Sequence, residues 1–457
     1  MAKKYQNVQK NISGIIIKLL LLKFPILWKK QGSNDDCHLS FREKICLQII
    51  AIWKIRTENR KFCEKASIIR KQKFYIQNRY SYQDKKILFV VEYITPRLKK
   101  IAEALYNEGY HITMLYSEAM EDINGNLTYT KKYCEDNQSY ECIEQLLLYL
   151  IESRIPILHY FGGWSYFENM LCMLQVKGIL PKIVFETYDI YNGMYIEKVV
   201  SEQRCKIERY CMEHADGVCC REYSMEYCVE HLGFRLHNPA LVFLDYVEEY
   251  NLLDKKEGQD NELSLCYVGG ITTEEEYPDA PYACFLQLAA MCEEQKCHLH
   301  VYPSIWNENQ FSRYLEFDRN SQYFHFHKPI DHSKLYQELG KYDYGIHPIR
   351  KTYLEKKLDG YVTHSKLVYS STNKYFDYIS AGIPQIGATP EKLTKELEKS
   401  GFLLRWTIDE YDFDELKRRK KEMRDIVIQN REYWMIKNRI FDLINYYEQI
   451  EERQEKQ

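Results

Sequence analysis

The sequence lacks the short motifs that mark several common kinds of site. Its 15 Cys include no C-x-x-C pair, so their spacing does not indicate a metal site. We interpret them as reduced thiols of a cytosolic protein, and the adjacent Cys219 and Cys220 as small core residues. No G-x-G-x-x-G follows the first predicted strand, at 86–91, so a nicotinamide or flavin cofactor is not expected.

A signal peptide and a long hydrophobic run are also lacking. The first apolar stretch, residues 12–28, is interrupted by Lys18, Lys23 and Pro25, whereas a transmembrane helix needs about 20 apolar residues. An amphipathic helix on an anionic membrane surface fits this stretch, and so does a helical cap packed on the first domain. Nucleic-acid binding has only the positive charge in its favour, so no nucleic-acid partner is expected.

Charge is distributed unevenly along the chain. Residues 1–83 carry 18 Lys and Arg against 5 Asp and Glu, although the whole chain has a net charge of −3. This asymmetry predicts a basic helical extension on an acidic body. The 457 residues, 45% of them hydrophobic, leave room for two domains after it. We expect a cytoplasmic protein, held at the inner face of the membrane if the extension binds lipid.

Residues 84–250 have the pattern of a parallel α/β domain. A strand at 86–91, a helix at 97–106 and a strand at 111–116 form a βαβ unit. Further strands are predicted at 155–161 and 182–186. In such a sheet the carboxyl ends of the strands carry the ligand site.

Polar residues near the ends of these strands are candidates for chemistry. They are His159, Trp164, Glu186 and Asp189. His159 is a candidate general base, because the pKa of histidine lies near neutrality. The alternatives are that His159 faces the core and that the carboxylates cap the following helices.

A polar segment at 251–262 is predicted to link this domain to a second one at 263–425. Its first strand, at 263–268, runs into Gly269 and Gly270, which allow a ligand to approach the backbone closely.

Two further predicted strands of the second domain carry pairs of histidines. His298 and His300 share one face of a strand, as do His325 and His327. We do not predict a metal here, because no carboxylate or Cys completes the set and histidines often pack on a strand face.

The stretch from Tyr369 to Ile386 combines a helix signal with groups that bind ligands. Ser371 and Thr372 precede apolar residues at helical spacing, and Gly382 ends the run. A helix N-terminus suits a phosphate, and Lys374 adds a cation there. Asp377 lies close to Lys374 on the helix surface and can accept hydrogen bonds from sugar hydroxyls. The alternative is an ordinary capped helix with an exposed Lys and Asp.

This stretch resembles the donor-site helix of GT-B glycosyltransferases. The family pattern is roughly Lys-aromatic-Phe-Glu/Asp-Tyr-x-x-Ala-Gly-x-Pro-x-Ile, and residues 374–386 read Lys-Tyr-Phe-Asp-Tyr-Ile-Ser-Ala-Gly-Ile-Pro-Gln-Ile. In that family the acidic residue, here Asp377, contacts the ribose of a nucleotide sugar, and the helix start lies at the diphosphate. The sequence differs at Tyr369, where the Glu-x7-Glu pattern of the retaining enzymes has its first Glu.

Other segments are similar to the same family. Residues 267–270 match its Tyr-Val-Gly-Gly strand, residues 215–218 its Ala-Asp-Gly-Val segment, and residues 342–348 its Tyr-Asp-x-Gly-Ile-x-Pro strand. Arg350 follows the last of these, and a guanidinium group matches the geometry of a phosphate.

The resemblance implies an α/β fold with two Rossmann-like domains facing a cleft (GT-B), plus the N-terminal helical extension. Residues 84–250 would be the acceptor domain and residues 263–425 the donor domain. A C-terminal helix over 426–457 would cross back to the first domain. The implied activity is transfer of a hexosyl group from a nucleotide diphosphate-sugar to a hydroxyl of a glycan or lipid-linked acceptor. Such an enzyme would serve cell-surface polysaccharide or glycolipid synthesis, without a bound metal or cofactor.

The resemblance also divides the candidate residues between the two substrates. On the donor side they are Gly269, Gly270, Arg350, Ser371, Thr372, Lys374 and Asp377. On the acceptor side they are His159, as the catalytic base, with Trp164, Glu186 and Asp189. Two alternatives stay open: a non-catalytic GT-B partner that stabilises an active glycosyltransferase, and a sugar-nucleotide epimerase of the same fold.

Overall fold

The computed structural model describes residues 84–122, 125–162, 167–194, 200–250, 252, 262–271, 285–331, 334–355 and 364–452. The predicted basic extension at 1–83, with its proposed membrane contact, lies outside these residues, as does most of the linker at 251–262. Within the described part of the chain, no helix combines the length and the apolar character needed to span a bilayer.

The first half of the described chain forms one parallel sheet with the strand order β3-β2-β1-β4-β5-β6-β7. Its strands are β1 (Lys86–Val91), β2 (His111–Ser117), β3 (Asp136–Tyr140), β4 (Ile157–Gly162), β5 (Lys182–Thr187), β6 (Gly217–Cys220) and β7 (Ala240–Val242). The helices of this half are α5 (Pro96–Asn107), α6 (Asn126–Lys131), α7 (Ile143–Glu152), α8 (Phe167–Gln175), α9 (Glu202–His214) and α10 (Ser224–Glu230).

Both faces of this sheet are buried, which explains why its central strands read as continuous apolar runs. Along β1, Ile87 and Phe89 belong to one core cluster, while Leu88 and Val90 belong to a second cluster on the other face. The helix α5 begins at Pro96, one residue before the predicted start, and the Thr95 hydroxyl caps it by accepting a hydrogen bond from the Leu98 amide.

The second half forms another parallel sheet with the order β10-β9-β8-β11-β12-β13. Its strands are β8 (Leu263–Gly269), β9 (Cys297–Pro303), β10 (Phe324–Phe326), β11 (Tyr344–His347), β12 (Gln385–Gly387) and β13 (Leu403–Leu404). The helices are α11 (Phe285–Glu294), α12 (Ser312–Asn320), α13 (Leu335–Leu339), α14 (Lys351–Glu355), α15 (His364–Tyr369), α16 (Asn373–Ser380), α17 (Glu391–Lys399), α18 (Phe413–Asn430) and α19 (Ile436–Glu452).

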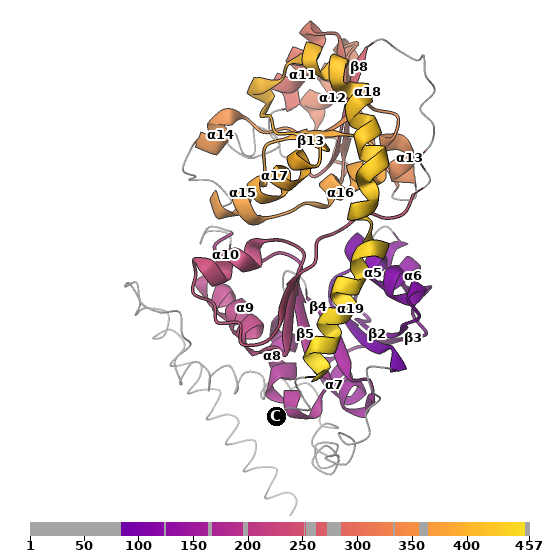
Figure 1. Cartoon of the computed structure of the whole chain (residues 1–457), viewed down its shortest axis with the longest axis vertical. Helices are drawn as coiled ribbons and strands as arrows, with labels where there is room; N and C mark the ends of the chain where they lie inside the picture. The colour runs from indigo at the N-terminus through magenta and orange to yellow at the C-terminus, as the bar shows by residue number, and fades with distance from the viewer. Residues whose placement is uncertain are drawn as a thin grey trace, which may run out of the picture. The chain divides into compact units, whose positions relative to one another are not determined.

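The predicted C-terminal helix is divided into α18 and α19 by a short 3-10 turn at Arg431–Trp434 (Figure 1). At this break the backbone of Val247 hydrogen-bonds to Trp434 O at 2.8 Å and to Ile436 N at 2.9 Å. The second helix, α19, then packs on α5 of the first domain. Of the two helices, it is therefore α19 that crosses back onto the first domain.

Each sheet changes the direction of its strand order at one place, between β1 and β4 in the first and between β8 and β11 in the second. In open parallel sheets ligands bind at such points, outside the carboxyl ends of the strands. In the second sheet this edge carries Gly269, at the end of β8.

Candidate functional site

The helix α16 carries the predicted donor-binding groups on the side that faces away from its core contacts. Thr372 precedes the helix in an extended conformation, and Tyr375, Phe376 and Ile379 are fully buried. Gly345 of β11 lets this helix pack closely, because a Cβ there would lie 2.4 Å from the Tyr378 ring.

Lys374 lies against the end of β8, so two of the predicted donor-side residues, Lys374 and Gly269, are neighbours. Gly269 has a φ of +132°, and a Cβ on it would lie 3.1 Å from Lys374 Nζ. The ammonium group donates a hydrogen bond to the Tyr267 hydroxyl at 3.3 Å. Burial and the nearby Arg221 guanidinium lower the pKa of Lys374 to about 8, although Asp377 raises it. The charged form of Lys374 is therefore less favourable here than in water, and a bound anion would stabilise it.

Asp377 lies one turn further along the same helix and faces the segment that follows β7. Its Oδ1 accepts a hydrogen bond from the Tyr336 hydroxyl at 3.5 Å. The pKa of Asp377 is raised to about 6. Burial is the largest cause, Glu248 and Asp245 raise the pKa as well, and Lys100 lowers it. The carboxylate is thus held in an environment that favours additional hydrogen-bond donors.

The two predicted hydroxyl residues, Ser371 and Thr372, have different surroundings. The Ser371 hydroxyl donates to Arg221 O at 3.0 Å, and its amide donates to Glu222 Oε2 at 3.3 Å. Ser371 thus joins the two domains. The Thr372 hydroxyl oxygen is buried and has no hydrogen-bond partner among the described residues. Of these two hydroxyls, that of Thr372 is the better placed for a ligand.

The remaining donor-side candidates lie at the same edge of the second sheet. Gly270 follows Gly269 directly, and its carbonyl accepts a hydrogen bond from the Tyr267 hydroxyl. Arg350 is half-buried in the turn between β11 and α14. β11 is the neighbour of β8 in the sheet, so Arg350, three residues after the end of β11, follows the strand next to the one that ends at Gly269.

His159 is a core residue in this structure. Its side chain has 0% exposure, and its ring stacks on Phe161 with the centroids 4.1 Å apart. Its Nδ1 hydrogen-bonds to the Tyr447 hydroxyl of α19 at 2.6 Å. Burial lowers its pKa. This position agrees with the alternative in which His159 faces the core, and it does not place the ring where an acceptor hydroxyl could reach it.

Glu186 and Asp189, predicted on the acceptor side, are both held by arginines. Glu186 accepts two hydrogen bonds from Arg97, at 2.9 and 3.1 Å. Burial alone would raise the pKa of Glu186, but Arg97 and His159 lower it to about 2. Asp189 Oδ1 accepts from Arg221 Nη2 at 2.6 Å. These carboxylates therefore stabilise the edge of the first sheet, and Trp164 lies outside the described residues.

A group formed by His159, Glu186 and Cys219 has the proximity of a metal site, since their ligand atoms lie within 4.8 Å of one another. The Arg97 guanidinium already neutralises the Glu186 carboxylate, however. Burial also raises the pKa of the Cys219 thiol well above its usual value, so a thiolate ligand is disfavoured. The residues present fit a buried ion pair rather than a metal ion.

Arg221 is the residue that sequence reasoning missed. It lies directly after β6 and pairs with Asp189 at 2.6 Å and with Asp245 at 3.1 Å. Its Nη1 also donates a hydrogen bond to Ser371 O at 3.2 Å, just before the start of α16. Arg221 could have been chosen as a candidate from its position at the carboxyl end of a predicted parallel strand. Ligands bind at that edge of a parallel sheet, so a charged residue there either contacts the ligand or positions the residues that do.

No protein-family model matches the sequence, and no curated protein does. Solved structures do match. HepE from Anabaena, solved with UDP, has a TM-score of 0.54 and 11% identity, covering 81% of this chain and 100% of HepE. TarM from S. aureus, solved with UDP among its ligands, has a TM-score of 0.52 and 6% identity, covering 80% of this chain and 99% of TarM.

A third match is the pneumococcal O-GlcNAc transferase GtfA, solved with UDP and GlcNAc. Its TM-score is 0.50 at 9% identity, covering 80% of this chain and 98% of GtfA. The chain has the GT-B fold. The predicted fold class, with its two Rossmann-like domains, is therefore confirmed. In this GT-B chain the helix α16 and the end of β8 belong to the second domain, and Arg221 to the first.

Proposed function

We propose that this GT-B chain is a glycosyltransferase, which moves a sugar from a nucleotide diphosphate-sugar to an acceptor hydroxyl. The observation that carries the proposal is the placement of Lys374 and Asp377 on one helix, with Lys374 against Gly269 at the carboxyl edge of the second sheet. A cation and a carboxylate at this edge suit the diphosphate and the ribose of such a donor.

The proposed chemistry at the donor is electrostatic. When the sugar leaves, negative charge grows on the diphosphate, and preorganised donors at that place lower the barrier. Lys374 supplies a cation, and its pKa, lowered to about 8, indicates that a bound anion would stabilise its charged form. The Thr372 hydroxyl and the first amides of α16 supply further donors. Arg350 is proposed as a second cation, and Gly270 as a position where the donor passes close to the backbone.

The acceptor is proposed to bind on the side of the first domain. A glycan or lipid-linked hydroxyl, in cell-surface polysaccharide or glycolipid synthesis, fits the proposal. HepE, TarM and GtfA were all solved with UDP, so UDP-sugars are the first donors to test. His159 and Glu186 are not assigned a catalytic role, because both are occupied in the core.

A second candidate, a non-catalytic partner of another glycosyltransferase, is favoured by Tyr369. This residue stands where the Glu-x7-Glu pattern has its first carboxylate. Its hydroxyl lies 3.1 Å from His231 Nε2, and its ring packs against Tyr227 with the centroids 5.2 Å apart. An aromatic contact between the domains thus stands at the position where that pattern has a carboxylate.

Thermal shift measurements with UDP-, GDP- and CMP-sugars test the proposal. We expect selective stabilisation by one nucleotide and its loss in Asp377→Ala. The exposed Asp414→Asn, on α18 and outside this site, is the matched control. Release of sugar from the bound donor, by hydrolysis or transfer, supports the enzyme. Donor binding without any turnover supports the non-catalytic partner, and no stabilisation by any donor contradicts the proposed donor site.

A further inference from the structure

The histidines of the second domain form one continuous face on two neighbouring parallel strands. His298 and His300 lie on β9 and His325 on β10, with His325 directly opposite His300 in the register. Leu299, between the two histidines of β9, and Phe324, next to His325 on β10, are fully buried on the other face of the sheet. The three imidazoles are therefore on the half-exposed face, where an ion can reach them.

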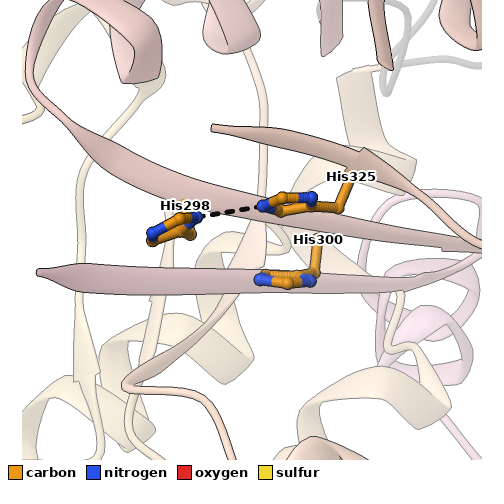
Figure 2. A group of neighbouring side chains, drawn as sticks. All are labelled: His298, His300 and His325. Atoms are coloured by element: carbon orange, nitrogen blue, oxygen red, sulfur yellow. Dashed lines mark hydrogen bonds between the residues drawn. The ribbon is translucent and has the colours of Figure 1, made fainter. Parts of the chain in front are cut away.

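The three rings bring their nitrogens together. His298 Nδ1 and His325 Nε2 are 2.9 Å apart in a hydrogen bond, drawn as the dashed line in Figure 2. The rings of His300 and His325 stack with their centroids 4.3 Å apart. One ring nitrogen from each of the three histidines lies within 4.8 Å of the other two. The three nitrogens are therefore near enough to meet on one metal ion once the rings turn toward it.

A carboxylate completes the arrangement, although none accompanies the histidines along the sequence. Glu262 Oε2 lies 3.0 Å from His298 Nε2. A carboxylate in this position accepts a hydrogen bond from the Nε2–H group of His298 and leaves the lone pair of Nδ1 directed at His325. Metal-binding histidines are commonly oriented by such a carboxylate partner. Glu262 was missed because it precedes His298 by 36 positions and lies at the end of the predicted linker.

We propose that His298, His300 and His325 bind one divalent transition-metal ion, with Glu262 orienting His298. Three imidazoles suit Zn²⁺, Ni²⁺ or Cu²⁺ better than Ca²⁺ or Mg²⁺, which prefer oxygen ligands. Zn–N bonds of about 2.0–2.1 Å place two ligand nitrogens about 3.3 Å apart. In the proposed site the rings of all three histidines turn to bring one nitrogen each to that separation, and a water molecule completes the tetrahedron.

The metal site is separate from the proposed donor site. His298 pairs in register with Ser264, at the start of β8, whereas Gly269 ends the same strand. The ion therefore joins the edge strand β10 to β9 and takes no part in sugar transfer. Its binding is testable without any activity measurement.

Calorimetric titration of Zn²⁺ into the untagged, metal-stripped full chain tests the site. We expect saturation at one ion per chain with a micromolar or lower Kd. His325→Gln should weaken the binding more than about tenfold, and Glu262→Gln by about 10- to 100-fold. His111→Gln, an exposed histidine of the first domain paired with Glu135, is the matched control and should bind as the unmodified chain does.

The absorption spectrum of bound Co²⁺ supplies a second measurement that separates nitrogen from thiolate ligands. Absence of saturable binding overturns the proposal, as does unchanged affinity in both His325→Gln and His300→Gln. A thiolate-type Co²⁺ spectrum also overturns it, because the 15 Cys would then hold the ion. Should His325→Gln fail to fold, as judged by its circular dichroism, the half-exposed His298→Gln replaces it.

Discussion

Lys374 shows how a single side chain is prepared for an anionic ligand. Burial beside Gly269 lowers its pKa to about 8, although Asp377 on the same helix raises it. A bound diphosphate would restore the charged state, because two negative charges close to an ammonium group raise its pKa. Binding of a nucleotide at the proposed donor site is therefore coupled to protonation of Lys374.

This coupling predicts a pH dependence of nucleotide binding. The pKa of Lys374 is about 8 in the chain without ligand and is expected to be higher when a diphosphate is bound. Above about pH 8, Lys374 therefore takes up a proton when the nucleotide binds. UDP affinity should therefore fall as the pH rises from about 8 to about 9.5, by at most about tenfold per unit. Calorimetry in two buffers of different ionisation enthalpy measures both the affinity and the proton uptake. In Lys374→Met the affinity should be low and should not vary with pH over this range. An equally steep fall in that variant would assign the proton to another group.

Asp377 should contribute to binding at a cost to folding. Its pKa is raised to about 6, so its charged form is less favourable in the folded chain than in the unfolded one. Asp377→Asn should therefore stabilise the fold at pH 7 by about 1 kcal/mol, less than the full pKa shift implies because the group is partly hydrated. The same variant should lose donor binding. Urea unfolding and thermal shift with donor measure the two effects, and a variant that is less stable at pH 7 would contradict this view of Asp377. The gain should vanish as the pH falls below about 4, where both states are protonated.

At the scale of elements, the turn after β8 depends on one glycine and tolerates change at the next. Gly269 has a φ of +132°, and an added Cβ would lie 3.1 Å from Lys374 Nζ. Gly269→Ala should therefore cost about 1–3 kcal/mol of stability and displace Lys374. Gly270→Ala is the matched control for stability, since no protein atom lies within 4 Å of its Cβ position. Chemical unfolding of both variants and UDP titration of Gly269→Ala measure these effects. Equal losses of stability in the two variants would contradict the proposed role of the turn.

Elements were predictable from sequence where local composition determines them. The strand β1 begins and ends at Lys86 and Val91 as predicted, because a continuous apolar run is typical of a strand buried on both faces. The edge strand β3 was missed, since Asp136–Tyr140 is polar and mostly half-exposed. The break between α18 and α19 was also missed. It depends on the backbone pairing of Val247 with Met435, which no local pattern encodes.

The same distinction holds for the candidate site. Lys374 and Asp377 could be predicted because their helix, its N-terminus and its glycine stop lie within one short stretch. The environment of Ser371 could not, because its partner Arg221 is 150 positions away. His159 was predicted on the correct strand, but its burial depends on Tyr447, 288 positions further along the chain.

For the whole molecule, Arg221 joins a buried ion-pair network of the first domain to the helix α16 of the second. It pairs with Asp189 and Asp245, and its backbone and side chain both hydrogen-bond to Ser371. Asp245 also lies 3.6 Å from Arg97. The start of α16 is thus positioned by residues of the other domain, so the proposed donor binding should depend on the contact between domains.

This arrangement predicts that a change in the first domain weakens binding at the second. Arg221→Met leaves the buried Asp189 and Asp245 with less compensation, so it should cost about 3–5 kcal/mol of stability. It should also weaken UDP binding, measured at a temperature where the variant is folded, because the backbone before Thr372 loses its anchor. Tyr223→Phe, which removes a more exposed bond between the domains to Glu396, should cost about 1 kcal/mol or less and leave UDP affinity unchanged. If Arg221→Met unfolds more readily yet binds UDP as tightly as the unmodified chain, the contact stabilises the fold without positioning the donor helix.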